Sequence, residues 1–202
     1  MVNDIVKDIA AIEALYGQPS EASVIKVADH LTPLYTKWIM DSRFCVVSTV
    51  GPGGTDGSPR GDDGPVVQPL DNKTLLMPDW RGNNRKDTLR NIVADGRISL
   101  MFFVPGSNNV VRVNGTAVVS TAPALIDRFE QNGRHPRSVV AITVAEVYSQ
   151  CARALMRAQI WTSGDESTGL PSVGELLAEQ KQGFDGQSYD AAWTGRAAKT
   201  MW

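Results

Sequence analysis

Cysteine and histidine are both scarce in this chain of 202 residues. Neither Cys45 nor Cys151 has a second cysteine or a histidine at metal-ligand spacing, so no zinc site is predicted. Both are interpreted as small buried apolar residues, because unpaired cysteine is among the most buried residue types. The sequence also lacks an HExxH motif, a GxSxG motif and a Ser/His/Asp order typical of hydrolases. No metal ligand and no catalytic residue is therefore predicted, and the chemistry is expected to come from a bound cofactor.

Long apolar runs and an excess of basic residues are missing as well. No stretch approaches the roughly 18 apolar residues that a membrane-spanning helix needs. The charged N-terminus lacks the apolar run of a signal peptide. A formal net charge of -2 argues against a general nucleic-acid-binding protein. We therefore expect a cytoplasmic protein that binds neither a membrane nor nucleic acid.

The stretch from residue 78 to residue 93 is the most informative part of the chain. An apolar run ends at Pro78, polar and glycine residues follow, and a helical repeat of apolar residues comes next. Asn84 with Asp87 three residues later resembles a capping box, which predicts a helix that begins near Asn84. Arg85 and Lys86 would then lie in its first turn.

Two cations at a helix start meet the positive end of the helix dipole, which is unfavourable. A phosphate bound there would make the same arrangement favourable, because the amides and both cations would face it. The alternative is a solvated helix start in which Asp87 already compensates the dipole. The residues alone leave both interpretations open.

The remaining pattern predicts a single domain built mainly of strands. Helices are predicted at residues 3–16, 29–41, 123–132, 151–161 and 172–182, and strands at residues 44–50, 66–70, 74–77, 97–104, 110–119 and 139–147. Residues 51–57 are interpreted as a hairpin turn and residues 58–65 as a polar, Gly/Pro-rich segment. Because tight turns join most strands, an antiparallel α+β or all-β barrel is favoured over a doubly wound sheet.

Arg153, Arg157 and Trp161 recur at helical spacing and form one stripe. Either the stripe is solvated near a helix C-terminus, where the dipole favours cations, or an anion lies between the two arginines. Residues 162–202 are interpreted as a linker, a helix and an arm that lies on the body or on a partner subunit.

Five segments resemble one known family. They are Phe44–Gly51, Ser58–Asp62, Leu76–Ile92, Arg112–Ala117 and Cys151–Arg157. They are similar to the pyridoxamine 5'-phosphate oxidase-like, FMN-binding split-barrel proteins, and more narrowly to a bacterial subgroup with Ser-Pro-Arg-Gly-Asp and Gly-Asn-Asn-Arg motifs. The resemblance implies a mainly β (α+β) fold, a six-stranded antiparallel split β-barrel with peripheral helices. It divides the chain into an N-terminal helical segment packing on the barrel (1–42), the barrel (43–161) and a C-terminal helix and arm (162–202).

The resemblance also implies a cofactor, FMN, and a homodimer with FMN at the subunit interface. Arg85 and Lys86 would hold the FMN phosphate, with Asn84 at the position of a hydroxyl-bearing ligand and Arg60 nearby. The remaining implied contacts are backbone from the loop at Pro78 and Asp79 to the flavin ring, Arg112 from a matching strand, and Arg157 and Trp161 from the other subunit.

The chain departs from true pyridoxamine phosphate oxidases in two places. Val110 stands where those enzymes carry a glutamine that contacts the flavin, and their C-terminal basic and histidine residues have no match here. The resemblance therefore favours an FMN-dependent oxidoreductase that passes hydride or electrons from a small-molecule donor to oxygen or another acceptor. The alternatives are a non-catalytic protein that binds or stores flavin or a B6 phosphate and, less favoured, a deazaflavin- or haem-binding split barrel.

Overall fold

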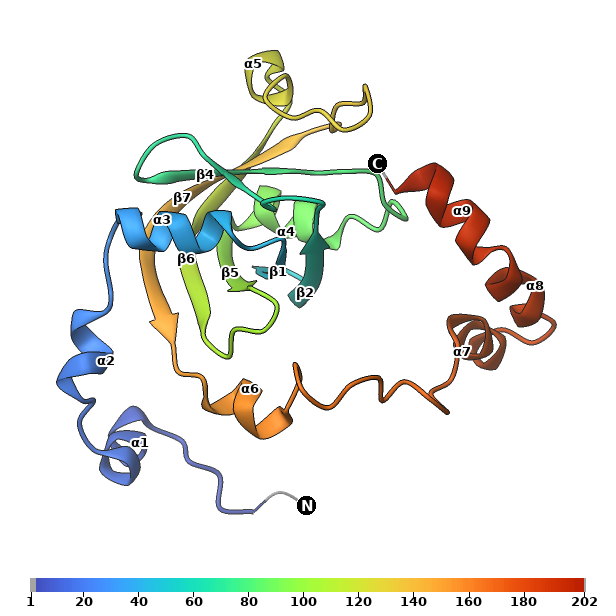
Figure 1. Cartoon of the computed structure of the whole chain (residues 1–202). Coiled ribbons are helices and arrows are strands. Elements are labelled where there is room, and N and C mark those ends of the chain that lie inside the picture. The colour runs from blue at the N-terminus through green and yellow to red at the C-terminus, as the bar shows by residue number, and fades with distance from the viewer. Residues whose placement is uncertain (1–2, 202) are drawn as a thin grey trace.

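The computed structural model describes residues 3–201 and shows one antiparallel sheet curled around a core, with helices outside it (Figure 1). Seven strands form the sheet in the order β2-β1-β5-β6-β7-β4-β3. Their bounds are β1 Phe44–Gly51, β2 Gly54–Gly61, β3 Gln68–Pro69, β4 Thr74–Pro78, β5 Arg97–Phe103, β6 Val110–Ser120 and β7 Val139–Gln150. The predicted antiparallel α+β architecture is confirmed. The sheet has seven strands instead of the six predicted. The strand β3 is shorter than the strand predicted at residues 66–70.

The additional strand, β2, occupies residues that the sequence describes as a turn and a Gly/Pro-rich segment. It pairs with β1 along its whole length, from Gly54 opposite Gly51 to Gly61 opposite Phe44. Cross-strand pairing outweighs the low strand propensity of these residues. Because β2 is at the edge of the sheet, Pro59 can lie in it without removing a needed hydrogen bond. The strand places Arg60 beside β1.

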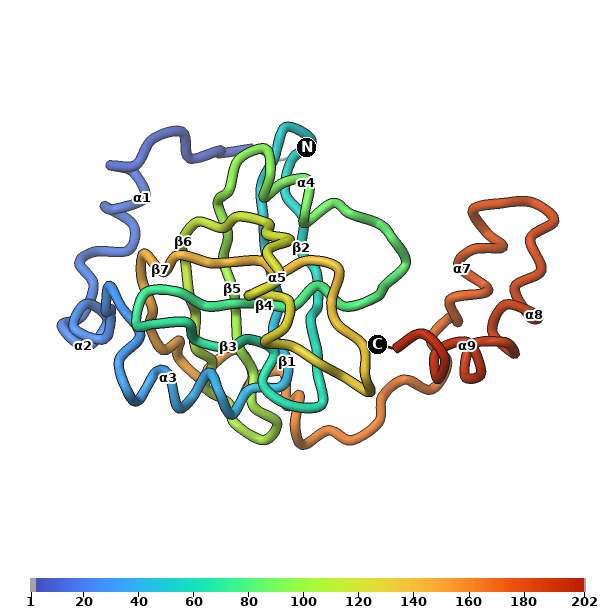
Figure 2. The backbone as a smooth tube through the Cα atoms, turned by 90° about the horizontal axis from the view of Figure 1, so that it is seen from above, coloured from blue at the N-terminus to red at the C-terminus, as the bar shows by residue number. Residues whose placement is uncertain are grey.

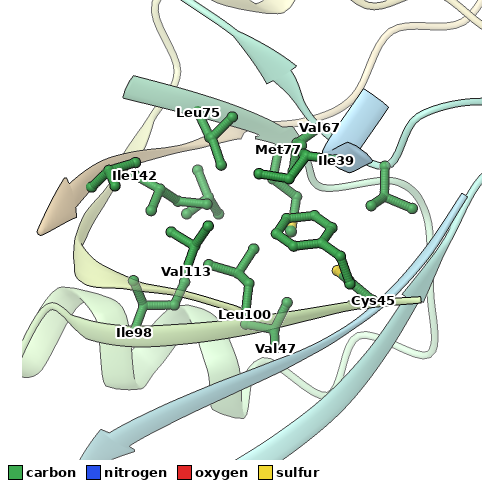
Figure 3. Packing of buried hydrophobic residues seen from close by; sticks show 14 of the residues in the cluster. Ile39, Cys45, Val47, Val67, Leu75, Met77, Ile98, Leu100, Val113 and Ile142 are labelled. Atoms are coloured by element: carbon green, nitrogen blue, oxygen red, sulfur yellow. The ribbon is translucent and has the colours of Figure 1, made fainter. Parts of the chain in front are cut away.

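The core consists of rows of side chains that adjacent strands present in register. Val47, Leu100, Val113 and Val147 form one such row across β1, β5, β6 and β7, and each is at most 1% exposed. Figure 3 shows the first three of these in the same cluster as Cys45. Burial raises the pKa of the Cys45 thiol to about 12. Cys151 follows the end of β7 and is exposed, so its predicted burial was wrong.

Helices cover the sheet and extend from both ends of it. Their bounds are α1 Ile9–Tyr16, α2 Glu21–Ile25, α3 Pro33–Met40, α4 Asp87–Ala94, α5 Pro123–Ile126, α6 Arg153–Ala158, α7 Val173–Gln180, α8 Gly186–Ala191 and α9 Trp193–Thr200. The helix α3 contributes Ile39 to the core and α4 contributes Ile92. Within the described residues 3–201, no helix has the length and apolar character needed to cross a membrane.

Several predicted helices are shorter than their patterns. The helix at 3–16 begins at Ile9, and the one at 123–132 ends at Ile126. The helix at 151–161 ends at Ala158, because Gln159 has a left-handed backbone with φ of 50°. Trp161 therefore does not continue the stripe of Arg153 and Arg157.

The terminal segments lie on opposite sides of the barrel (Figures 1 and 2). Neither α1 nor α2 contains a buried residue. At the other end, α7 opens with a capping box formed by Ser172 and Glu175. The carboxylate of Asp190 accepts hydrogen bonds from the Ser172 hydroxyl, at 2.5 Å, and from the Gly174 amide, at 2.8 Å, which ties α7 to α8. The arm expected after α7 contains the helices α8 and α9.

A register shift between Asn114 and Gly115 leaves Ala145 of β7 without a partner on β6 and bends β7 at this point. A Cβ atom at Gly115 would collide with the carbonyl oxygen of Thr143 on β7. We therefore expect Gly115→Ala to lower the free energy of unfolding by about 1–3 kcal/mol, through overpacking.

Urea unfolding followed by circular dichroism measures this change. Gly53→Ala is the matched control, because a Cβ at Gly53 would meet open space. Equal stability of the two variants would contradict the close approach of β6 and β7.

Candidate functional site

A cleft of about 180 Å³ lies where β2, the loop after β4, the start of α4 and the segment before β7 meet. Five cationic side chains and one carboxylate line this cleft, which we call the cationic cleft: Arg60, Arg81, Arg85, Lys86, Arg137 and Asp79. A second cleft of about 170 Å³ adjoins it on the other side of the same loop. Pro78, Trp80 and Met201 are among the residues that line the second cleft.

The structure brings together five of the nine predicted site residues in the cationic cleft. They are Arg60, Asp79, Asn84, Arg85 and Lys86. Pro78 lines the adjoining cleft. The three others lie elsewhere in the chain.

Arg112, Arg157 and Trp161 line neither cleft. Arg112 on β6 donates to the Gln150 side chain at 3.3 Å and lies over the Tyr148 ring. Arg157 belongs to α6, and the Trp161 indole donates to the Ser107 carbonyl at 2.8 Å. Their assignment to the flavin stays a prediction that requires a second subunit.

The expected helix start at Asn84 was wrong. Asn84 has a left-handed backbone with φ of 61°, whereas an N-cap residue is normally extended. The helix α4 begins at Asp87, so Arg85 and Lys86 precede its first turn. Asp87 lies in that turn, where its charge is favourable, and it also pairs with the Arg85 guanidinium.

The Arg85 side chain nevertheless remains 81% exposed, so it can turn toward a ligand. The backbone amide of Arg85 donates to the Asn83 side chain at 2.9 Å, which shapes the loop. The two predicted cations therefore enter the cleft from a loop rather than from a helical turn.

Asp79 is held rigidly at the boundary between the two clefts. Its backbone amide donates to the Ser138 carbonyl at 3.0 Å. Its carboxylate lies 4.0 Å from the Arg60 guanidinium, and its side chain is 25% exposed. Burial raises the pKa of Asp79, and the attraction of Arg60 and Arg137 only partly opposes this rise.

Trp80 is positioned by a polar contact and an apolar one. Its indole donates to Asp62 at 2.7 Å, and the other oxygen of Asp62 accepts from Gln131 at 3.2 Å. The ring packs against a small cluster formed by Leu76, Phe129 and Val139. The aspartate of the Ser-Pro-Arg-Gly-Asp motif thus supports the wall of both clefts.

Arg137 was not among the predicted site residues. It lines the cationic cleft and its guanidinium donates to the Asn84 side chain at 3.4 Å. It reaches the cleft because Val139 pairs with Pro78, which places the residues before β7 beside those after β4. No local motif marks Arg137, so only the pairing of two strands distant in sequence could have identified it.

No group of three or more His, Cys, Asp or Glu side chains suited to a metal ion occurs among residues 3–201. Cations from three separate segments surround the small volume of the cleft. This arrangement is suited to a phosphate or a similar anion.

We expect Asp62→Ala to lower the free energy of unfolding by about 1.5–3 kcal/mol, because a hydrogen bond to a charged group is lost and the Trp80 indole is left without this acceptor. Urea unfolding measures the loss. Asp63→Ala is the control, since Asp63 is adjacent, of the same charge and exposed. A loss no larger than that of the control would show that Asp62 does not support the site.

Comparisons with known proteins give a family and a fold. A family model described as pyridoxamine 5'-phosphate oxidase matches residues 31–151. A variant of HupZ from Group A Streptococcus has a TM-score of 0.50 and 21% identity, and covers 59% of this chain and 99% of its own. General stress protein 26 from Bacillus anthracis has a TM-score of 0.43 and 17% identity, with 56% and 88% covered. A comparison with curated proteins finds no match.

The family model covers more than half of the chain, from α3 to the end of β7. The matched residues include the segments that line the cationic cleft and the strands next to them. The chain therefore belongs to the pyridoxamine 5'-phosphate oxidase family and has its split-barrel fold.

Proposed function

We propose that this protein is an FMN-dependent oxidoreductase that passes hydride or electrons between a small-molecule donor and oxygen or another acceptor. The observation that supports this proposal is the cationic cleft in a member of this family. Its volume of about 180 Å³ is small, which suits a phosphate group rather than a whole flavin.

The residues present suit a phosphomonoester. Arg60 and Arg137 offer planar guanidinium groups that can donate two hydrogen bonds to one phosphate, whereas Lys86 supplies a compact point charge. The exposed guanidinium of Arg85 adds a further positive charge. These like charges repel one another, and a bound phosphate would offset that repulsion.

When bound, FMN would supply the redox chemistry. The chain would contribute the phosphate contacts, the backbone at Pro78 and Asp79 beside the ring, and the fixed indole of Trp80 as a wall. None of these roles requires a side chain of the protein to form a bond with substrate.

We further propose that the protein acts as a homodimer with FMN at the subunit interface. Arg157 and Trp161 do not line the cationic cleft of their own chain. They would therefore contact FMN only in the cleft of a second copy. Arg112 lies on the outward side of β6, between the buried positions Val111 and Val113, where a second copy could also reach it.

We expect wild-type protein to bind FMN more tightly than riboflavin, which lacks the phosphate. Combined substitution Arg85→Ala and Lys86→Ala should weaken FMN binding at least ten- to a hundredfold, because one charged contact contributes about 1.5–3 kcal/mol. Visible spectra recorded during titration with each flavin give both affinities.

Arg90→Ala is the matched control, because Arg90 is an exposed arginine of α4 that does not line the cleft. Unchanged FMN affinity in the double variant would place the flavin phosphate elsewhere. Equal affinity for FMN and riboflavin would show that the phosphate does not contribute to binding, which contradicts the proposed role of the cationic cleft.

A second candidate function is non-catalytic binding or storage of flavin or a B6 phosphate. One observation favours it. Among the described residues that line the cationic cleft there is no histidine, and Asp79 is the only carboxylate. Few groups are thus available to transfer a proton.

Anaerobic addition of NADH or NADPH to the FMN-loaded protein separates the two functions. We expect the flavin absorbance to bleach, and to return when air is admitted, because an oxidoreductase must accept and release electrons. FMN held tightly without bleaching by either nicotinamide or by an amine donor would favour storage.

A further inference from the structure

Asp79 is an acid in a site otherwise built from cations. Within residues 3–201 it is the only carboxylate that lines the cationic cleft. It cannot easily withdraw, because its backbone amide is bonded to the Ser138 carbonyl and its side chain is mostly buried. A ligand in the cleft must therefore lie near this carboxylate as well as near the arginines.

A fully ionised anion is repelled by a carboxylate, and such a like-charge contact is costly in a partly buried site. An anion that still carries a proton behaves differently, because an ionised carboxylate accepts hydrogen bonds. A phosphomonoester loses its second proton near pH 6, so a fraction keeps an O–H group around neutrality. Sulfate has no such proton at neutral pH.

We propose that Asp79 makes the cationic cleft selective for phosphates that carry a proton and excludes fully ionised tetrahedral anions such as sulfate. The P–O–H group would donate to the Asp79 carboxylate while Arg60 and Arg137 bind the remaining oxygens. The proposal rests on the function proposed above, in that the same cleft is taken to hold the phosphate of FMN.

The charges around Asp79 fix the expected pH dependence. Arg60 approaches it from β2 and Arg137 from the segment before β7, and both guanidinium groups attract its carboxylate. Burial raises the pKa of Asp79 above the ordinary value of 3.8. As the pH falls through that raised pKa, the carboxylate is neutralised and its repulsion of sulfate disappears. Sulfate affinity should therefore increase on acidification.

Calorimetric titration of the flavin-free full chain with inorganic phosphate and with sulfate at pH 7 tests the proposal. Wild type should prefer phosphate by about tenfold or more, since one pKa unit of differential interaction corresponds to a tenfold change. Asp79→Asn should raise sulfate affinity by a similar factor and bring the ratio near one. It should also abolish the increase of sulfate affinity on acidification.

Two further variants serve as controls. Asp79→Glu keeps a carboxylate and should keep the preference for phosphate. Asp63→Asn removes the same charge from an exposed neighbouring position that does not line the cationic cleft, so it should leave the ratio unchanged. Circular dichroism confirms that each variant is folded.

The outcomes distinguish this proposal from the proposed function. An unchanged anion ratio in folded Asp79→Asn overturns the role of Asp79, even if wild type binds FMN. Selectivity that depends on Asp79 without FMN binding supports the role of Asp79 and rejects FMN as the ligand. If wild type binds neither anion, the selective cleft is rejected.

Discussion

The pairing of β4 with β7 is the interaction on which the candidate site depends. Pro78 lies opposite Val139, and the Asp79 amide extends the ladder to the Ser138 carbonyl. Residues that are almost 60 positions apart are thereby brought to one cleft. The pairing is secured by side chains such as Leu75 and Ile142, which are at most 1% exposed. Burial of these strands thus provides the rigidity that a loop alone would lack.

The electrostatics of the cleft follow from that geometry. Cations from β2, from the loop before α4 and from the segment before β7 converge, and their mutual repulsion opposes folding of the empty site. Asp79 offsets part of the charge of Arg60, and Asp87 offsets part of that of Arg85. Only part of the charge is compensated, so the cleft retains a positive potential that favours an anion. The excess of cations also explains why the carboxylate of Asp79 is tolerated in a cleft suited to an anion.

Much of the fold could be predicted from periodicity, because alternation and apolar runs report directly on burial. The strands β1, β4, β5, β6 and β7 were identified in this way. The strand β2 was missed because its residues have poor strand propensity and it exists through pairing with β1. The early end of α6 was missed because an apolar repeat does not reveal a left-handed residue such as Gln159.

The amino-acid sequence identified Arg85 and Lys86 as a pair of cations after an apolar strand and carried the motifs of a recognisable family, but its residues alone left open whether the pair binds an anion. Which groups share a cleft with this pair became visible only in the folded chain. The tertiary structure added Arg137 to the cleft, placed Asp79 at its edge, and left Arg112, Arg157 and Trp161 outside it. The physical reason is that local patterns encode residue type and backbone preference, whereas the position of a loop depends on strand pairing between segments distant in the chain.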